Sequence, residues 1–387
     1  MDHIRIEKKS RLSKIWEKYS NIIFLVFLIG ATTLIILTQV DPETFIKTIK
    51  QANGWYLLLG IGCVFVYWNL EAFMLFKLMQ RDNPAETFHF AWTLTIVGQY
   101  YNLLDPSSTG GQPVQLYEMS KRNYKLGSGT AVLIQKYALY QITTTFLALL
   151  SIIFCITELH RSLDAAKWLI IIGLILNVAA VILIIILVFR PKSAKAIILG
   201  CVNFLLKIRI LKNPEKYYRK VDHFVGEYKM AIDALKSHKL QTAQMFIISI
   251  IQMLIFYSIN YWVYLSLGLS AVNAITIISL QAILYVAVAF VPTPGAAGGA
   301  EAGFLLIFGP IFGPAYTPVA MILWRMISFY FILLFGGIYL SIHSIKMGKG
   351  RVKAIEEEID EEVNLVIEES EKQGEFSENN RNKADYR

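Results

Sequence analysis

Long apolar stretches dominate the chain, and polar residues gather in the segments between them. A transmembrane helix requires about 20 mostly apolar residues. The chain is therefore predicted to be an all-α polytopic membrane protein. Six stretches are long and apolar enough to predict full transmembrane helices: residues 22–39, 55–79, 129–156, 168–189, 242–267 and 317–342.

Two further apolar stretches, residues 88–104 and 274–291, run into segments rich in Pro and Gly. Irregular backbone is tolerated at membrane depth only where protein surrounds it or where it lines a water-filled cavity. We expect each stretch to enter the membrane, turn at its Pro/Gly segment and return to the same side as a re-entrant helical hairpin. The alternative is that both stretches cross the membrane fully, which gives eight crossings.

The distribution of Lys and Arg predicts the orientation, because cytoplasmic segments of membrane proteins are enriched in these residues. Residues 1–21 carry six of them, and residues 190–240 carry twelve against four acidic residues. Both segments are expected to be cytoplasmic, as is the C-terminus. If the two broken stretches form re-entrant hairpins that enter from opposite sides, the other basic loops are cytoplasmic too. The predicted organisation is a basic arm (1–21), a transmembrane domain (22–343) with a helical basic loop (190–241), and an acidic, partly disordered tail (344–387).

The amino-acid composition agrees with a membrane protein, and the distribution of charge indicates which partners it binds. The chain is 55% hydrophobic and 17% charged, with a mean hydropathy of +0.48, which excludes an ordinary cytosolic enzyme and a disordered protein. The net charge of +8 equals the charge of the basic loop alone, so anionic inner-leaflet lipids are the expected partners rather than nucleic acid. The six His and three Cys are dispersed, and no zinc-protease, P-loop or G-x-S-x-G motif is present. No metal or cofactor is predicted.

The two Pro/Gly segments, residues 106–111 and 294–299, share the pattern P-x-x-x-G-G at an offset of 188 residues. A cation follows each one in the next helix, Lys136 and Arg325, at an offset of 189. The order of span, broken hairpin and span also repeats, with the opposite direction. Inverted repeats of this kind are typical of secondary transporters, whose site lies at the repeat interface. Chance recurrence of the pattern in a Gly-rich membrane protein is the alternative.

Four ionisable residues lie within the apolar segments: Glu71, Lys136, Glu301 and Arg325. A charge at the bilayer centre costs about 2.5–3.5 kcal/mol on insertion scales, and such residues usually mark a pathway or a pair. The cations would supply counter-charge to an anionic substrate, and the helices that start after the breaks would add free N–H groups. One alternative is that these residues form two purely structural ion pairs, Glu71 with Lys136 and Glu301 with Arg325. Another is that the side chain of Lys136 extends to the membrane–water interface.

These features predict a lipid translocase whose site binds a phosphate-bearing headgroup. Such a group suits the residues better than a bare metal ion, which would require more carboxylates. The candidate substrate-binding residues come from both breaks, from their polar neighbours and from the intramembrane charges: Glu71, Tyr101, Asn102, Pro106, Ser108, Thr109, Gly110, Gly111, Gln112, Lys136, Pro294, Gly298, Gly299, Glu301 and Arg325.

Residues 101–117 (YNLLDPSSTGGQPVQLY) and 291–303 (VPTPGAAGGAEAG) resemble the lysylphosphatidylglycerol synthase transmembrane family, the flippase-like region of the bacterial multiple peptide resistance factor. The resemblance extends over about residues 22–343, and Arg325 is similar to a late arginine of that family. It implies translocation of an anionic or aminoacylated phospholipid or a polyprenyl phosphate across the bacterial plasma membrane. A separate lipid synthase and a homo-oligomer are implied as possible partners. The sequence departs from the family in three places. Many members carry an Arg at the position of Ala300, and an acidic–arginine pair at the position of Gln135-Lys136. An Arg that is common after the first break is replaced here by neutral polar residues such as Gln115.

The best-known member of that family carries a soluble aminoacyl-transferase domain after its last span, whereas here residues 344–387 follow. We therefore expect that this polypeptide does not itself perform lysyl transfer. Two other functions stay open beside the translocase. One is a lipid-modifying membrane enzyme of the phosphatidylglycerol lysyltransferase type, and the other is a small-anion exporter.

Overall fold

The computed structural model describes residues 42–81, 83–105, 110–122, 124, 126–155, 166–189 and 239–342, together with single positions between 195 and 233. Within these residues the protein is helical and contains no strand. The predicted first span (22–39), the basic arm, most of the basic loop and the tail lie outside the described residues, as do residues 106–109 of the first break.

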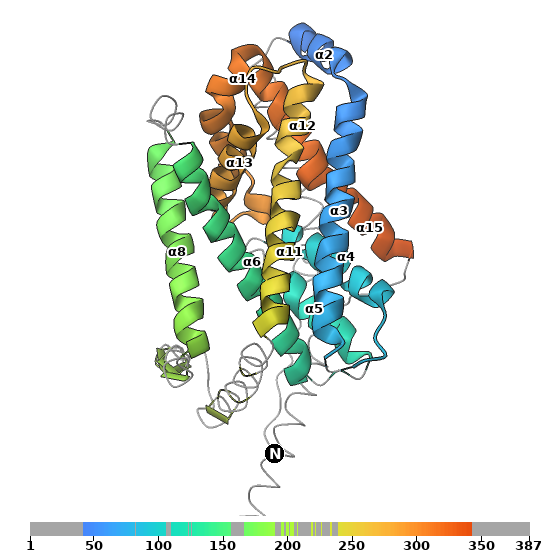
Figure 1. The fold of residues 1–387 in the computed structure, drawn as a ribbon, viewed down its shortest axis with the longest axis vertical. Coiled ribbons are helices and arrows are strands. Elements are labelled where there is room, and N and C mark those ends of the chain that lie inside the picture. Colours follow the sequence, from blue (N-terminus) through green and yellow to red (C-terminus); the bar gives the residue numbers. More distant parts are fainter. Residues whose placement is uncertain are drawn as a thin grey trace, which may run out of the picture.

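The longer helices form an elongated bundle (Figure 1). We call the end at which α3 begins the upper end and the end at which it finishes the lower end. In chain order the elements are α2 (Pro42–Gln51), α3 (Gly54–Met79), α4 (Phe88–Leu104), α5 (Gly111–Ser120), α6 (Leu126–Phe154), α8 (Lys167–Phe189), α11 (Lys239–Tyr257), α12 (Ile259–Ser266), α13 (Ala274–Val288), η1 (Pro294–Ala296), α14 (Gly299–Arg325), η2 (Met326–Tyr330) and α15 (Phe331–Ile342).

The described part of the chain contains five helical segments that are long and apolar enough to cross a membrane. The prediction of an all-α, multi-span membrane protein is confirmed at this level. The fifth segment is the longest because it joins the second break to the last helix. The five segments are Gly54–Met79, Ser128–Phe154, Lys167–Ile185, Lys239–Ser266 and Pro294–Leu340.

The last span differs from its predicted bounds of 317–342. Helix α14 begins at Gly299 and continues to Arg325 through a kink at Gly313, whose backbone is non-helical (φ 73°, ψ 164°). The positive φ favours glycine, and Pro314 has no N–H to continue the helical hydrogen bonds. The chain reverses there at the upper end and descends through the π-helix η2 to α15 (Figure 1).

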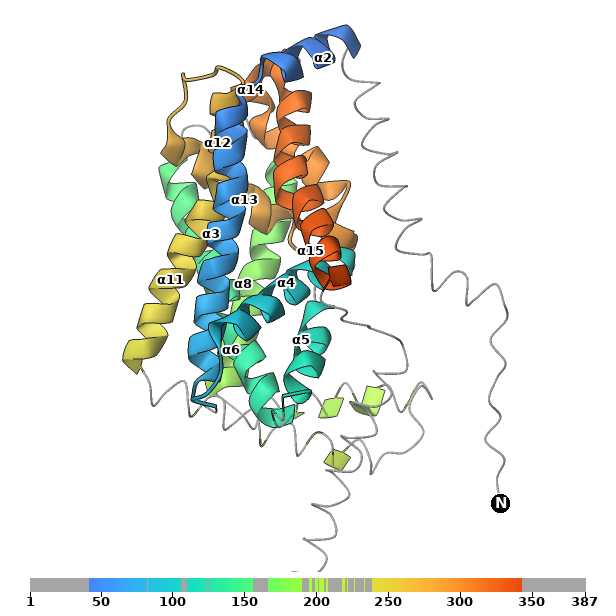
Figure 2. The ribbon, with the colours of Figure 1, turned by 90° about the vertical axis from the view of Figure 1, so that its right-hand side faces the viewer.

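The two broken stretches lie at opposite ends of the bundle. The first hairpin (α4 and α5) starts and finishes near the lower end, and the second hairpin (α13 and residues 299–312 of α14) starts and finishes near the upper end (Figures 1 and 2). The tip of the second hairpin, η1, packs against α4. The two hairpins therefore meet in the interior of the bundle.

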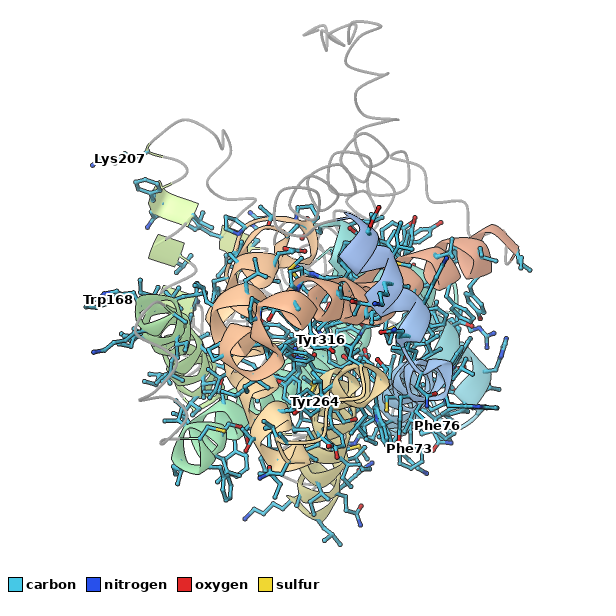
Figure 3. The ribbon with its side chains drawn as sticks, turned by 90° about the horizontal axis from the view of Figure 1, so that it is seen from above. Phe73, Phe76, Trp168, Lys207, Tyr264 and Tyr316 are labelled. Carbon is cyan, nitrogen blue, oxygen red and sulfur yellow. The ribbon has the colours of Figure 1, made fainter. Side chains whose placement is uncertain are left out.

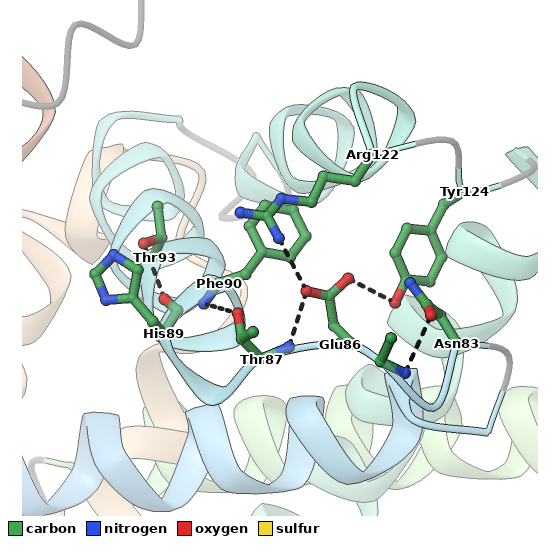
Figure 4. A network of polar contacts seen from close by, with 9 residues as sticks. Asn83, Glu86, Thr87, His89, Phe90, Thr93, Arg122 and Tyr124 are labelled. Atoms are coloured by element: carbon green, nitrogen blue, oxygen red, sulfur yellow. Dashed lines mark hydrogen bonds and ion pairs between the residues drawn. The ribbon is translucent and has the colours of Figure 1, made fainter.

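A buried carboxylate fastens the base of the first hairpin (Figure 4). Glu86, in the turn before α4, accepts hydrogen bonds from Arg122 Nη1 at 3.3 Å and from the Tyr124 hydroxyl at 3.0 Å. The Arg122 guanidinium also lies 4.3 Å from the centroid of the Phe90 ring. Residues before α4 and after α5 are thereby held together, so the hairpin closes on itself at the lower end.

The periphery of the bundle is apolar, as expected for a surface that faces lipid. Trp55 and Trp168 are strongly exposed at the starts of α3 and α8, which matches an interfacial aromatic belt. Seen from the upper end, Trp168 lies at the outer edge, whereas Tyr264 lies near the centre (Figure 3). Tyr264 is buried against Phe312, so aromatic packing closes the core below α2.

Candidate functional site

The bundle encloses a cavity of about 220 Å³ between α3, α4, α6, α11 and α13. Its lining is unusually polar for the interior of a membrane protein. Besides one ion pair and several tyrosines, the cavity is lined by amide and hydroxyl side chains: Gln99, Asn102, Gln112, Gln141, Thr144, Asn177, Ser249 and Gln252.

The ion pair joins α6 to α3 within this cavity. Lys136 Nζ lies 2.8 Å from Glu71 Oε1, and the two side chains are only 15% and 6% exposed. Each partner has a second hydrogen bond, because Glu71 Oε2 accepts from Gln99 at 2.6 Å and Lys136 donates to Gln115 Oε1 at 3.4 Å. Paired and hydrogen-bonded charges are the form in which ionisable groups are tolerated in a low-dielectric interior.

Hydrogen bonds between helices order the remaining polar wall. The hydroxyl of Tyr140 donates to that of Tyr285 at 2.7 Å, which connects α6 to α13. Asn177, on the most apolar span, accepts from Gln141 at 2.9 Å and donates to the Val286 carbonyl at 3.0 Å. This carbonyl lies near the C-terminus of α13, where the last carbonyl groups have no N–H donor four residues later in the helix. These polar groups are thus positioned by contacts among three helices, α6, α8 and α13.

Both hairpins contribute to the cavity. Asn102 and Leu103 precede the first break, and Ala289 and Phe290 precede the second one. Phe290 is 45% exposed, so this part of the rim is open. The segments around the two breaks therefore share one hollow.

A second charged cluster lies at the second break. Arg325 Nε is 2.7 Å from Glu301 Oε1, and Arg325 Nη1 donates to the Gly295 carbonyl at 3.2 Å. Glu301 Oε2 in turn accepts from the backbone N–H of Gly298 at 2.6 Å, which caps the start of α14. Both charged side chains are about 5% exposed, and neither lines the cavity.

This second cluster holds the backbone of the break in an uncommon conformation. Gly295, Ala296 and Gly298 all have positive φ (59°, 53° and 83°), a region in which glycine is the most stable residue. The guanidinium also lies near the rings of Trp324 and Phe329, at 5.0 and 5.4 Å. Arg325 therefore binds the turn that precedes its own helix.

The structure places the predicted site residues in three groups. The cavity contains Glu71, Asn102, Gln112 and Lys136. The second break contains Pro294, Gly298, Gly299, Glu301 and Arg325. The joint between α4 and α5 contains Gly110 and Gly111, while Tyr101 is half-buried on α4, and Pro106, Ser108 and Thr109 lie outside the described residues.

Two details of the prediction change. Lys136 lies on α6, not on the helix directly after the first break, because the short helix α5 and a turn intervene. Gly111 allows α5 to pack closely against α4, because a Cβ at this position would lie 2.2 Å from the Gly98 carbonyl oxygen. Its N–H donates to Asn102 Oδ1 at 2.9 Å, so this amide is already occupied.

Sequence reasoning predicted the cavity amides Asn102 and Gln112 but missed the other amide and hydroxyl residues, although a signal was present. Gln141 and Thr144 are three residues apart, as are Ser249 and Gln252, and this spacing places each pair on one helix face. A polar pair on one face of an otherwise apolar span indicates a face that lines a polar interior.

A metal centre has no support in this site. Among the residues that the structure describes, no group of three or more His, Cys, Asp or Glu side chains has metal-binding geometry. The chemistry available in the cavity is that of one lysine, one carboxylate, amides and hydroxyls. Such groups are suited to hydrogen-bond and orient a polar ligand, and an ammonium like that of Lys136 is suited to pair with a phosphate.

Comparison with known proteins agrees with this architecture. The family described as the lysylphosphatidylglycerol synthase TM region matches residues 21–336, a range that includes both hairpins and every side chain of the cavity. The chain is also similar to a UPF0104 membrane protein of Archaeoglobus fulgidus, with 23% identity over 319 residues. That alignment covers 82% of this chain and 95% of the relative, so the similarity extends through the membrane part of both proteins.

Proposed function

We propose that this chain, which belongs to the lysylphosphatidylglycerol synthase TM region family, is a translocase that moves phosphate-bearing lipid headgroups across the bilayer. Family membership supports a lipid-related role in the membrane. The proposed substrates are anionic or aminoacylated phospholipids, or polyprenyl phosphates.

The polar cavity is the observation that carries this proposal. A phosphate headgroup crosses hydrocarbon slowly because it loses its hydration, and a cavity lined by amides, hydroxyls and one ion pair replaces water as its partner. A volume of about 220 Å³ suits a headgroup and not a complete phospholipid. The acyl chains would remain in the membrane beside the open rim at Tyr137 and Phe290.

The ion pair suits the exchange of partners that transport requires. When a phosphate binds Lys136, the contact with Glu71 opens, and Gln115 and Gln99 still hydrogen-bond the two separated groups. Glu71 is then available to an ammonium or a hydroxyl of the same headgroup. The cavity therefore offers both charges of an aminoacylated or zwitterionic lipid a partner.

The proposed topology is six full transmembrane helices and two re-entrant hairpins of opposite direction, with both termini in the cytoplasm. The proposed location is the plasma membrane. The opposed hairpins at the two ends of the bundle support an inverted repeat. Movement of one repeat against the other would open the cavity to each side in turn.

Transport by purified protein in liposomes tests the proposal. The headgroup of an added phospholipid is followed by its accessibility to a membrane-impermeant reagent. The double variant Glu71→Gln/Lys136→Gln preserves the shape of the cavity without its charges, and we expect its rate to fall at least tenfold. Lys121→Gln is the control, because it removes a surface lysine that follows α5 and pairs with Glu118 outside the cavity. A double variant that transports at the wild-type rate contradicts the proposal.

Two other outcomes would replace this function by a different one. Conversion of the lipid into a new product by the purified protein would identify an enzyme. Uptake of free inorganic phosphate into liposomes that contain no substrate lipid would identify an anion exporter.

A further inference from the structure

A second hollow lies on the outer surface of the bundle, near its lower end. It is a groove of about 770 Å³ between α3 and α11. The walls are largely apolar and include Phe73, Leu240 and Ile247, all of them exposed. Figure 3 shows Phe73 and Phe76 at the outer edge of the bundle.

Positive charge is concentrated at one end of this groove. Lys77 lies near the end of α3, and Lys239 is the first residue of α11. The Lys77 ammonium is 5.7 and 5.5 Å from the ring centroids of Phe73 and Phe76, and 3.4 Å from Gln80 Oε1. In the described part of the chain, no carboxylate forms an ion pair with either lysine. The groove thus combines two cations with an apolar track, the pattern that an anionic phospholipid fits.

Only a thin wall separates the groove from the polar cavity. The two hollows lie on adjacent faces of the same helices, because Phe73 and Ile248 line the groove whereas their neighbours Met74 and Ser249 line the cavity. Met74, Met245 and Leu139 form a small buried cluster apart from the main core, and Met245 also lines the groove. Methionine side chains are flexible and repack readily. Repacking of these methionine side chains would open this wall.

We propose that this groove is the lateral entrance for the substrate: an anionic phospholipid from the leaflet at the lower end binds with its phosphate at Lys77 and Lys239, and its headgroup enters the cavity between Met74 and Met245. The transport part of this inference rests on the proposed function, whereas occupancy of the groove by lipid does not. Under the proposed topology the leaflet is the cytoplasmic one. The acyl chains lie along Phe73 and Ile247.

Lipid retention tests the groove without any transport. Protein is purified from nanodiscs of phosphatidylglycerol and phosphatidylethanolamine, and the retained lipids are counted by native mass spectrometry. We expect Lys77→Gln/Lys239→Gln to lower retained phosphatidylglycerol at least threefold. The control Lys47→Gln/Lys50→Gln removes two exposed lysines of α2 at the opposite end and should retain the wild-type amount. Equal retention in both variants overturns the site, as does a second copy of the chain found in place of lipid.

A reactive lipid tests passage through the wall. In a chain whose native cysteines are replaced by Ser, Ser249→Cys places a thiol in the cavity, and a phospholipid with a thiol-reactive headgroup labels it from the bilayer. We expect Met245→Trp to slow labelling at least tenfold, whereas the volume-matched Met245→Leu labels normally. Equal labelling in the two variants, each eluting as a monodisperse folded protein, overturns the entrance.

The two proposals fail separately. Normal labelling through the groove without translocation by the wild-type protein would overturn the translocase function and leave the lipid entrance in place. Translocation that persists in Met245→Trp would overturn the entrance and leave the translocase in place.

Discussion

The two intramembrane ion pairs have the same chemistry in different surroundings. Lys136 and Glu71 face a cavity, and each has an amide partner to stabilise it when the pair opens. Arg325 and Glu301 face backbone: one binds the Gly295 carbonyl and the other the Gly298 N–H. At the scale of single residues, the first pair is suited to exchange a ligand, and the second is suited to hold a turn.

The second pair therefore controls stability. Arg325→Gln leaves the Glu301 carboxylate buried without its cation, and breaking a buried pair from one side costs about 3–5 kcal/mol. We expect a large fall in melting temperature in detergent. The double variant Glu301→Gln/Arg325→Gln should melt above the single variant, since it leaves no unpaired charge. A single variant that melts like the wild type would show that the pair does not hold the break.

At the scale of elements, each hairpin depends on close contact between its own helices. In the first hairpin α4 and α5 meet at Gly98 and Gly111, and Glu86 ties the two open ends together. In the second hairpin Gly299 packs against Val291, and Gly295 lies beneath the ring of Phe329. The glycines of the repeated pattern thus allow the chain to reverse inside the bundle.

Substitution at Gly111 should loosen the first hairpin. Gly111→Ala places a Cβ 2.2 Å from the Gly98 carbonyl oxygen, so α5 must shift away from α4. We expect faster hydrogen exchange in both helices and a lower melting temperature. Gly62→Ala is the matched control, because its Cβ meets no atom within 4 Å inside α3. Replacing a helical glycine there should stabilise the protein by about 0.5–1 kcal/mol. Unchanged exchange in the Gly111 variant would contradict this contact.

At the scale of the whole molecule, the opposed hairpins decide where every loop lies. If α4 and α5 return to the lower end, the turn before α4 and the turn after α5 share one side of the membrane. If residues 88–104 cross fully, the same two turns lie on opposite sides. The loop between α12 and α13 lies at the upper end of the bundle (Figure 1), so it marks the side with which the two turns are compared.

Cysteine labelling from outside intact cells distinguishes these topologies. In a chain with Cys63, Cys155 and Cys201 replaced by Ser, single cysteines are introduced at Ala85, Lys121 or Ala271, all of them exposed. We expect an impermeant thiol reagent to label Ala271→Cys only, with the other two labelled after the membrane is permeabilised. Labelling of Lys121→Cys from outside would support full crossing of the first hairpin.

Much of the framework followed from the sequence alone. The predicted stretch 88–104 coincides with α4, and the predicted span 55–79 differs from α3 by one residue. The apolar runs are long enough that burial in lipid leaves few alternatives to a helix. The kink at Gly313 was not predicted as the boundary of the last span, because glycine and proline also occur inside transmembrane helices.

The sequence by itself determined the class of protein, most spans, the charge asymmetry and the two breaks, because these depend on local composition and on the cost of exposing backbone to hydrocarbon. Only the tertiary structure decided which polar residues meet. It brought Gln99 of α4, Asn177 of α8 and Gln252 of α11 to the cavity that contains Lys136, and it separated Arg325 from that cavity. These outcomes depend on the rotation and packing of helices distant in the chain, which no local pattern specifies.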